Sequence, residues 1–529
     1  MPTLDEIVTA ARFLKALPGL LRNPIRPEEA AAILHARLAH RERDFLALVD
    51  QAVYGKADSP YRPLMEAAGC EGGDVEALVR RDGVEGALRA LYAAGVYLTV
   101  DEFKGRHPAV RGGCAVTVTP ASLRNPASVI QVASRPGGSR GTGSPVPLDP
   151  AAIRDWAVNE SVAYSAWGGE RWTHGRWSIP GGATIGQLLL YAAFGASPGR
   201  WFSQVDPYAP DLDPRYRWSA RMLRWGSALA RVPMPASEHV PVDAPLPVAG
   251  WMAEVLRAGG TPHLATYPSS AVRVCQAAQK AGLELAGARF SVGGEPVTPA
   301  RLAAIRRAGA GATPRYGSSD AGLIGEGCLA PTVADDLHLY QDLHAVVQPG
   351  PRAERPGVPA EALLISSLRP SAPLFLLNVS LGDRGTLGTR RCGCPLELRG
   401  WTTHLHTIRS YDRLTAGGMM FPDADIVRVL EERLPARFGG APTHYQLVEE
   451  QGPDSLPVLR LLVHPHVTIE QPEAVAEAFL AALGDHGGSG TVMEQVWRQA
   501  GMLRVERTAP VLTPSGKIRH FHSRSAPDA

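Results

Sequence analysis

The chain has 529 residues, of which 45% are hydrophobic and 20% are charged. This composition is that of a soluble globular protein, and the length predicts at least two domains, because one hydrophobic core rarely grows beyond about 250–300 residues. The 54 Lys and Arg residues nearly balance the 52 Asp and Glu residues, which gives a formal net charge of +2. A balance this close to neutral excludes a strongly basic nucleic-acid platform or an acidic tail.

The N-terminal sequence and the cysteines indicate the compartment. The stretch MPTLDEIVTAARFLKALPGLL contains acidic residues early and no long apolar run. We therefore expect neither a signal peptide nor a membrane span. Six cysteines are too few for a disulfide framework in a chain of this length. We expect a cytoplasmic protein with reduced thiols, in which Cys70, Cys114 and Cys275 are packing residues and clustered cysteines are metal ligands.

The periodicity of apolar residues divides the chain into three regions. Helical spacing dominates residues 4–98, as in DVEALVRRDGVEGALRALYAAGV. Strand-like and helical runs then alternate, which favours layered α/β architecture. Near Arg409 the chain restarts with a charged helix, a strand and a further helix, typical of a small α+β module of about 120 residues. We expect a helical N-terminal region at 1–100, a core at 101–408 and a C-terminal module at 409–529.

Three polar loops in the core are candidate binding segments. The first, SRPGGSRGTGSPVPLD at 134–149, can turn backbone N–H groups and hydroxyls towards phosphate, although a flexible turn has the same composition. The second, SVGGEPVTPARL at 291–302, reads as a strand-to-helix turn capped by Thr298, which leaves Glu295 unexplained. The third, PRYGSSDAGLIGEG at 314–327, combines a ring, small residues, hydroxyls and a carboxylate. A nucleotide site needs that combination, and a polar loop with a capping Asp is the alternative.

The C-terminal stretch VLTPSGKIRH can likewise be interpreted as a functional segment or as a structural turn. By itself it is typical of a surface hairpin turn with a solvated Lys517. However, it follows LGDRG at 381–385 and IRSYDRLTAGG at 408–418, and these come after the three polar loops in a fixed order. In this order and spacing, residues 103–519 resemble the adenylate-forming (ANL) superfamily, and within it the phenylacetate-CoA ligase-like branch.

The resemblance implies an α/β fold in which a large multi-sheet N-terminal adenylation domain carries a small, mobile α+β C-terminal domain. It also implies an acid–CoA ligase type of activity, in which ATP, Mg²⁺ and a small carboxylic acid give an acyl-adenylate and the acyl group passes to a thiol. Coenzyme A is the expected acceptor, and a carrier-protein phosphopantetheine or an amine stays open. The acid is expected to be aromatic or otherwise small. We expect no nucleic-acid or membrane partner, and a monomer or homodimer.

The resemblance assigns the nucleotide-binding residues by position. The phosphate loop would be formed by Ser139, Thr142 and Gly143. Gly294, Glu295 and Pro296 match the segment that lines the adenine. In the next loop Tyr316 would stack near the base, Gly317 and Ser318 would shape the turn, and Ser319 would contact the α-phosphate or the acid. Asp383 matches the residue that binds the ribose hydroxyls.

The resemblance assigns catalytic roles to three further residues. Asp320 stands where a Glu usually binds magnesium, Arg409 matches the inter-domain hinge, and Lys517 matches the lysine that neutralises charge during adenylation. That role suits a mobile ammonium, because adenylation brings anions together. The chain departs from the family at Arg140–Gly141, at Val146 in place of a Lys and at Tyr411–Asp412. These departures leave open a ligase-like binding protein with reduced catalysis.

Two further groups of residues complete the sequence-based expectations. Cys328, His338, Cys392 and Cys394 resemble the structural zinc ligands of some phenylacetate-CoA ligase-like proteins, and tetrahedral zinc takes such a set readily. His344 is an alternative to His338, and buried cysteines commonly serve only as small hydrophobic residues. In the segment ERWTHGRWSIP, Trp172, His174 and Trp177 could line a pocket for an aromatic acid or simply be partly buried aromatic residues.

Overall fold

The computed structural model describes residues 4–529 with the exception of 127, 129–131, 135–145, 197, 207–208, 210–213, 412–425, 427, 441–443, 486–488, 512–520 and 525–529. Its largest feature is a twelve-stranded sheet with the order β13-β14-β15-β16-β12-β11-β10-β9-β8-β5-β6-β7. Strand β10 divides this sheet, because it pairs in parallel with β9 and antiparallel with β11. The α/β fold class predicted from the sequence is confirmed.

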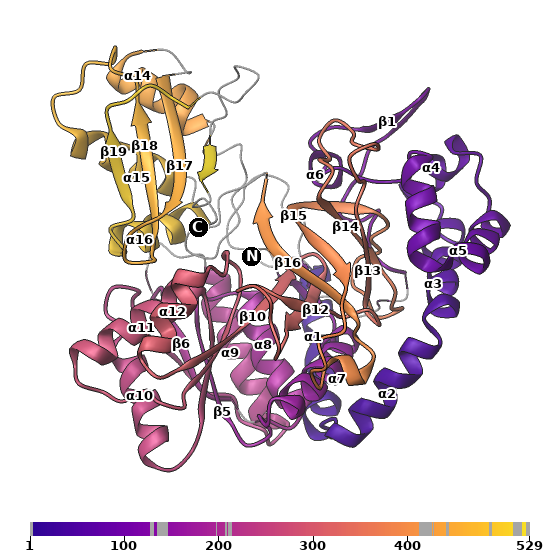
Figure 1. The fold of residues 1–529 in the computed structure, drawn as a ribbon, viewed down its shortest axis with the longest axis horizontal. Coiled ribbons are helices and arrows are strands. Elements are labelled where there is room, and N and C mark those ends of the chain that lie inside the picture. The colour runs from indigo at the N-terminus through magenta and orange to yellow at the C-terminus, as the bar shows by residue number, and fades with distance from the viewer. Residues whose placement is uncertain are drawn as a thin grey trace.

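The parallel half of the sheet is enclosed between two layers of helices (Figure 1). One face packs on α7 and α8, against which α1 and α2 of the N-terminal region pack in turn, and the other on α10, α11 and α12. Parallel strands of such a sheet are buried on both faces, and all five residues of β8 (PHLAT) are buried. The strands are β5 (Thr173–Ser178), β6 (Pro198–Ser203), β7 (Ser237–His239), β8 (Pro262–Thr266), β9 (Arg289–Val292) and β10 (Gly311–Ser318). The helices are α7 (Pro150–Ala166), α8 (Gly182–Ala193), α9 (Pro214–Leu229), α10 (Leu246–Arg257), α11 (Pro268–Lys280) and α12 (Pro299–Arg307).

Helix starts in this half follow simple capping chemistry. Asp149 accepts a hydrogen bond from the backbone N–H of Ala151 and precedes a proline at the first position of α7. Thr298 does the same for α12 through the N–H of Arg301, as expected from the sequence. Such caps satisfy N–H groups that have no partner inside the helix.

The antiparallel half of the sheet packs on the N-terminal helices, which lie on the opposite side of the molecule from the C-terminal module in Figure 1. Its core joins residues such as Phe45 and Leu88 to Val346 and Leu364. The strands are β11 (Gly322–Gly327), β12 (Leu337–Leu339), β13 (His344–Val347), β14 (Ala362–Ser367), β15 (Val379–Thr389) and β16 (Thr403–Ser410). The N-terminal helices are α1 (Leu4–Arg22), α2 (Pro27–Ala39), α3 (Arg41–Val49), η1 (Asp50–Tyr54), α4 (Tyr61–Ala67), α5 (Gly72–Ala93) and α6 (Val100–Phe103).

Several short elements complete this part of the chain. Two-stranded sheets are formed by β1 (Ala109–Arg111) with β2 (Cys114–Val116), and by β3 (Val132–Ser134) with β4 (Val146–Leu148). A single 3-10 turn, η2 (Glu397–Arg399), precedes β16. No helix within the described ranges is both long enough and apolar enough to cross a membrane.

The C-terminal module is a four-stranded sheet with the order β19-β18-β17-β20, packed on helices. The strands are β17 (Tyr445–Gln451), β18 (Pro457–Val463), β19 (Leu503–Glu506) and β20 (Phe521–Arg524), and the helices are η4 (Val429–Arg433), α14 (Leu434–Phe438), α15 (Pro472–Gly484) and α16 (Ser489–Gln499). Its hydrophobic core includes Ile179 and Val205, which directly follow β5 and β6. The module therefore lies over the carboxyl ends of the parallel strands.

Candidate active site and metal centre

Two of the three sequence-predicted binding loops meet at the carboxyl ends of the parallel strands. The Gly-Gly-Glu-Pro segment follows β9, and Tyr316 lies near the end of the neighbouring β10. Ligands of open α/β sheets bind at this edge, because the loops leaving adjacent strands form a crevice there. Residues 291–302 and 314–327, which are separate in the sequence, thus form one surface.

Two glycines allow the loops to approach each other closely. A Cβ at Gly293 would lie 2.6 Å from the carbonyl oxygen of Arg315, and one at Gly317 would lie 2.6 Å from that of Gly322. Gly294 has a φ of 81°, in the left-handed region that favours glycine. A side chain at Gly293 or Gly317 would push neighbouring strands apart, and one at Gly294 would strain the backbone.

Glu295 has a structural role that the sequence alone did not reveal. Its carboxylate accepts hydrogen bonds from the backbone N–H and the hydroxyl of Ser269, at 3.0 and 2.8 Å, at the start of α11. Arg301 adds a buried ion pair at 3.2 Å and also donates to the carbonyl oxygen of Pro296. Glu295 therefore anchors the loop to the first turn of α11 and to the Arg301 side chain of α12.

Tyr316 and Asp383 are in direct contact. The Tyr316 hydroxyl donates to Oδ2 of Asp383 at 3.0 Å, and both side chains are largely buried. Asp383 lies on β15, opposite Ser410 on β16. The predicted base-stacking ring and the predicted ribose carboxylate are therefore neighbours, although 67 residues separate them.

Asp320 forms an ion pair with Lys104, which the sequence analysis missed. Lys104 Nζ lies 2.9 Å from Asp320 Oδ2, and the Asp320 side chain is only 3% exposed. The other carboxylate oxygen, Oδ1, is buried and has no hydrogen-bond partner among the described residues, and the same holds for Oγ of Ser319. Ser318 Oγ accepts from the N–H of Ala321 and closes the turn. No local signal could have linked Lys104 to this turn, because 216 residues separate the pair.

Arg409 lies at the end of the large sheet, two residues before the chain leaves the described part. Its Nη1 contacts Asp335 Oδ2 at 3.0 Å. The same carboxylate accepts from the backbone N–H groups of Thr407 and Ile408, at 2.9 and 3.0 Å. Asp335 therefore holds the end of β16 at the predicted inter-domain boundary. The sequence analysis did not predict this contact.

Four predicted residues, Ser139, Thr142, Gly143 and Lys517, lie outside the described residues. The chain on either side of the Lys517 segment is fixed to β17. Val511 exchanges two hydrogen bonds with the Gln446 side chain, and Phe521 pairs with Leu447. Both attachments lie near the start of the same strand.

The predicted metal ligands form a compact cluster. Donor atoms of Cys328, His338, Cys392 and His404 all lie within 4.8 Å of one another. Cys394 Sγ lies 3.1 Å from His338 Nε2, so the full predicted set is gathered in one place. His404 also belongs to the cluster, although its position in the sequence did not indicate this. The pairing of β12 with β16 sets it beside His338. His344 Nε2 instead donates to the carbonyl oxygen of Leu323, and His344 does not belong to the cluster.

The surroundings of the two histidines orient both rings. His338 Nδ1 donates to the carbonyl oxygen of Trp401 at 2.6 Å, and His404 Nδ1 donates to Asp336 at 2.7 Å. Each contact leaves Nε2 available as a ligand, and the buried Nε2 of His404 has no partner among the described residues. Burial lowers the pKa of His338 to about 4, which keeps the ring neutral. Soft sulfur donors and neutral imidazoles fit zinc.

The cysteines of this cluster differ in acidity. Burial raises the pKa of Cys328 to about 12 and also raises that of Cys392. Burial opposes ionisation of Cys394 too, but the backbone N–H of Glu397 and the Cys392 thiol bring its pKa below the ordinary value. A metal cation would remove the protons of the other two thiols, since it binds thiolates.

Beneath Tyr316, a fully buried charged network fills the face of the sheet covered by α7 and α8. The Arg315 guanidinium contacts Glu160, Glu326 Oε2 at 2.9 Å and Gln187 Oε1 at 2.6 Å. Two carboxylates share one cation here. Burial, reinforced by the nearby Glu160 and opposed by Arg315, raises the pKa of Glu326 to about 8.

The aromatic segment around residue 174 does not form one pocket lining. His174 is buried against Tyr164 and Tyr191, and its Nδ1 lies 2.9 Å from Nδ1 of His263. Trp177 belongs to the hydrophobic core on the opposite face of the sheet, where its indole N–H donates to the carbonyl oxygen of Val240. The odd spacing of the two residues on β5 explains this, because side chains alternate along a strand. The alternative of buried aromatic residues is the better description.

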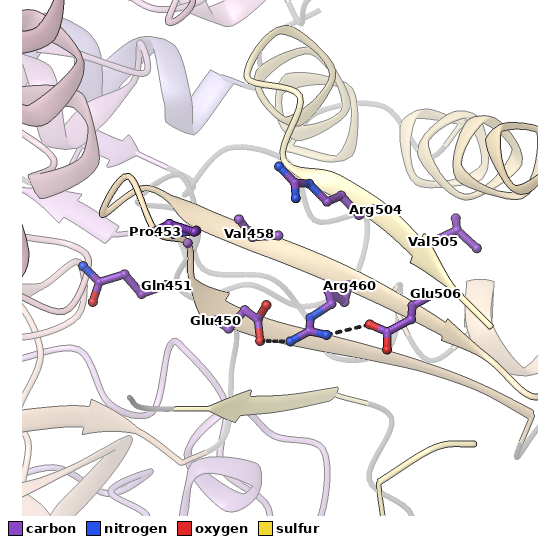
Figure 2. Close-up of a pocket in the computed structure, with 9 residues that line it drawn as sticks. Glu450, Gln451, Pro453, Val458, Arg460, Arg504, Val505 and Glu506 are labelled. Carbon is purple, nitrogen blue, oxygen red and sulfur yellow. Dashed lines mark hydrogen bonds and ion pairs between the residues drawn. The ribbon is translucent and has the colours of Figure 1, made fainter. Parts of the chain in front are cut away.

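The C-terminal module carries a hollow of about 410 Å³ on its sheet (Figure 2). Arg460 lies between Glu450 and Glu506 and is 2.6 Å from the latter, and Arg504 of the same lining balances the second carboxylate. The adjoining Gln451 donates to Thr298 of the large domain at 2.9 Å. The hollow therefore borders the contact between the two domains, and its paired charges give it no strong preference for an anion.

Comparisons with known proteins support the fold. No protein-family model matches the chain, and no curated protein matches it. The crystal structure of 2-hydroxyisobutyryl-CoA ligase in complex with 2-HIB-AMP and CoA in the thioesterification state superimposes with a TM-score of 0.53 at 16% identity, over 92% of this chain and 90% of that one. The same ligase in the postadenylation state gives 0.44 at 16% identity, over 94% and 90%. The first of these superpositions shows that the chain has the fold of this CoA ligase.

Proposed function

We propose that this protein uses ATP to convert a small carboxylic acid into an acyl-adenylate and then transfers the acyl group to the thiol of coenzyme A. The observation that carries this proposal is the meeting of Tyr316, Asp383 and Asp320 at the carboxyl edge of the sheet. A ring, a ribose-binding carboxylate and a metal-binding carboxylate are what an ATP site requires. The C-terminal module lies over the same edge and can exclude water from it.

In the first half-reaction a carboxylate oxygen of the acid attacks the α-phosphorus of ATP. The bond to the bridging oxygen breaks and pyrophosphate leaves. Because both reactants are anions, the reaction needs placed positive charge. In our proposal Lys517 supplies an ammonium to the carboxylate and α-phosphate, and Ser139, Thr142 and Gly143 cradle the phosphates.

In the second half-reaction the thiol attacks the acyl carbon and AMP leaves. CoA is the proposed acceptor because the ligase with the same fold is in complex with 2-HIB-AMP and CoA. A hinge at Arg409 would let the module from 409 onwards withdraw Lys517 between the two steps. Asp335 would hold the fixed side of this hinge.

Two metals complete the proposal. Magnesium neutralises phosphate charge and takes oxygen ligands, and Asp320 Oδ1 is a buried carboxylate oxygen that lacks a partner among the described residues. Zinc would be structural and held by Cys328, Cys392, Cys394 and His338, with His404 as a fifth available donor. A closed site of soft donors contributes to folding rather than to the reaction.

Carboxylate-dependent exchange of labelled pyrophosphate into ATP tests the adenylation step. We expect exchange with at least one acid from a panel of aryl, heteroaryl and aliphatic acids. A folded protein that binds MgATP but exchanges with none of a broad panel would favour the alternative of a ligase-like binding protein.

A further inference from the structure

Lys104 is held in place by a rigid turn. The short helix α6 begins at a reciprocal cap, in which Thr99 and Glu102 each accept from the other's backbone N–H, at 3.3 and 2.9 Å. Arg111 grips the Glu102 carboxylate with two hydrogen bonds, at 2.7 and 2.9 Å. The backbone N–H of Lys104 closes the helix on Val100. The position of the Lys104 backbone is therefore determined by contacts that do not involve Asp320.

The same turn is attached to the strand that carries Asp383. Leu98 pairs with Val379 at the start of β15 and exchanges backbone hydrogen bonds with Asn378 and Ser380, at 3.2 and 2.9 Å. Lys104 and Asp383 therefore belong to one rigid unit. This unit brings a cation to the loop of Tyr316 and Asp320 from the N-terminal helical region.

The ion pair with Lys104 satisfies only one of the two oxygens of the Asp320 carboxylate. Lys104 occupies Oδ2 of Asp320 and leaves Oδ1 buried without a partner in the described part of the chain, next to a similarly unpartnered Ser319 hydroxyl. A purely structural carboxylate normally has both oxygens satisfied, because a buried unpaired acceptor is costly. The Lys104 side chain is 25% exposed, so it lies at the border between the buried carboxylate and solvent. An ammonium has three N–H donors and can serve Asp320 and a phosphate oxygen together.

We propose that Lys104 is a positioning residue for the ATP site: it fixes Asp320 through Oδ2, turns Oδ1 towards the magnesium position and adds positive charge beside the phosphates. This inference rests on the proposed ATP-dependent function. Lys104 would also supply a positive charge that the phosphate loop lacks, because Val146 stands where that loop was expected to carry a lysine.

The test is the affinity for MgATP, measured by titration calorimetry with the carboxylic acid left out so that no turnover occurs. We expect Lys104→Gln to weaken MgATP binding tenfold or more, because charge-assisted hydrogen bonds to phosphate are strong. Lys104→Arg, which keeps the charge, should stay within threefold of wild type. Arg106→Gln is the matched control: it removes a cation two residues away that pairs with the half-exposed Asp101, and binding should not change.

A second variant separates positioning from stability. Lys104→Gln alone leaves a buried carboxylate without its cation and can lower the melting temperature. Lys104→Gln combined with Asp320→Asn removes both charges, so we expect the melting temperature to recover while MgATP binding stays weak. Wild-type affinity in Lys104→Gln would overturn the inference and leave the proposed function intact. Failure of the wild-type protein itself to bind MgATP would overturn the proposed function.

Discussion

The carboxylate site around Asp320 and the Cys/His cluster around His338 are both built from distant segments, but their polar atoms are satisfied to different degrees. In the cluster, both histidines have second partners, Trp401 and Asp336, that fix the rings. At Asp320, one carboxylate oxygen and the neighbouring Ser319 hydroxyl have no partner among the described residues. Nε2 of His404 also lacks a partner among the described residues, so the difference lies in how firmly the donor side chains are held. We propose that the cluster holds one permanent metal ion and that the Asp320 site takes a ligand that binds and leaves.

The largest effect should come from Lys517→Ala. Without the ammonium, the C-terminal module is expected to lose the charge that neutralises the attacking carboxylate and the α-phosphate. Pyrophosphate exchange should fall by two orders of magnitude or more, while the melting temperature changes little. Lys280→Ala, which removes an exposed lysine of α11, is the control. Exchange within about tenfold of wild type, a loss of only about 1.4 kcal/mol, would contradict the assignment.

Asp320→Asn should have the next largest effect. Asparagine keeps the size and the capping ability of the side chain but removes the charge that we propose binds magnesium. We expect a higher Mg²⁺ requirement and at least a tenfold loss of exchange, with a small change in melting temperature. Activity that is unchanged across a Mg²⁺ titration would return Asp320 to a role in capping the turn.

The Cys/His cluster should respond in stability rather than in chemistry. Protein purified without chelators should contain about one zinc per chain by elemental analysis. Cys392→Ser should lower both the zinc content and the melting temperature, because metal binding is coupled to folding. Cys70→Ser changes a half-buried thiol outside the cluster and should affect neither quantity. A zinc-free protein with wild-type stability would reject a structural metal here.

The smallest effect concerns Glu326 and pH. Its pKa is raised from 4.5 to about 8, mainly by burial, so the folded state binds this proton more tightly than the unfolded state. The resulting stabilisation is present in full below pH 4.5 and is lost as the pH rises through 8. Glu326→Gln removes this dependence, so its melting temperature relative to wild type should increase between pH 5 and 8.5. A constant difference across that range would show that Glu326 stays ionised in the folded protein.

The fold class and the turns of two candidate loops could be predicted from sequence, because local chemistry specifies such turns. Thr298 and Pro299 mark a helix start, and Gly293 and Gly317 mark close approaches of neighbouring strands. Lys104, Asp335 and His404 could not be predicted, since their roles arise only when distant strands and turns come together. Trp177 shows the opposite failure, in which residues close in sequence lie apart in space. It is three residues from His174 on β5, and side chains alternate along a strand, so it lies on the other face of the sheet.

The central claim is that an acid oxygen becomes bonded to the α-phosphorus of ATP. The most direct measurement uses a carboxylic acid that supports exchange, labelled with ¹⁸O in both carboxyl oxygens, together with ATP, Mg²⁺ and CoA. Mass spectrometry then follows the label into AMP. An acyl-adenylate intermediate predicts one ¹⁸O in each AMP released and an acyl-CoA formed in equal amount. Unlabelled AMP, produced by attack of water on ATP, would contradict the account.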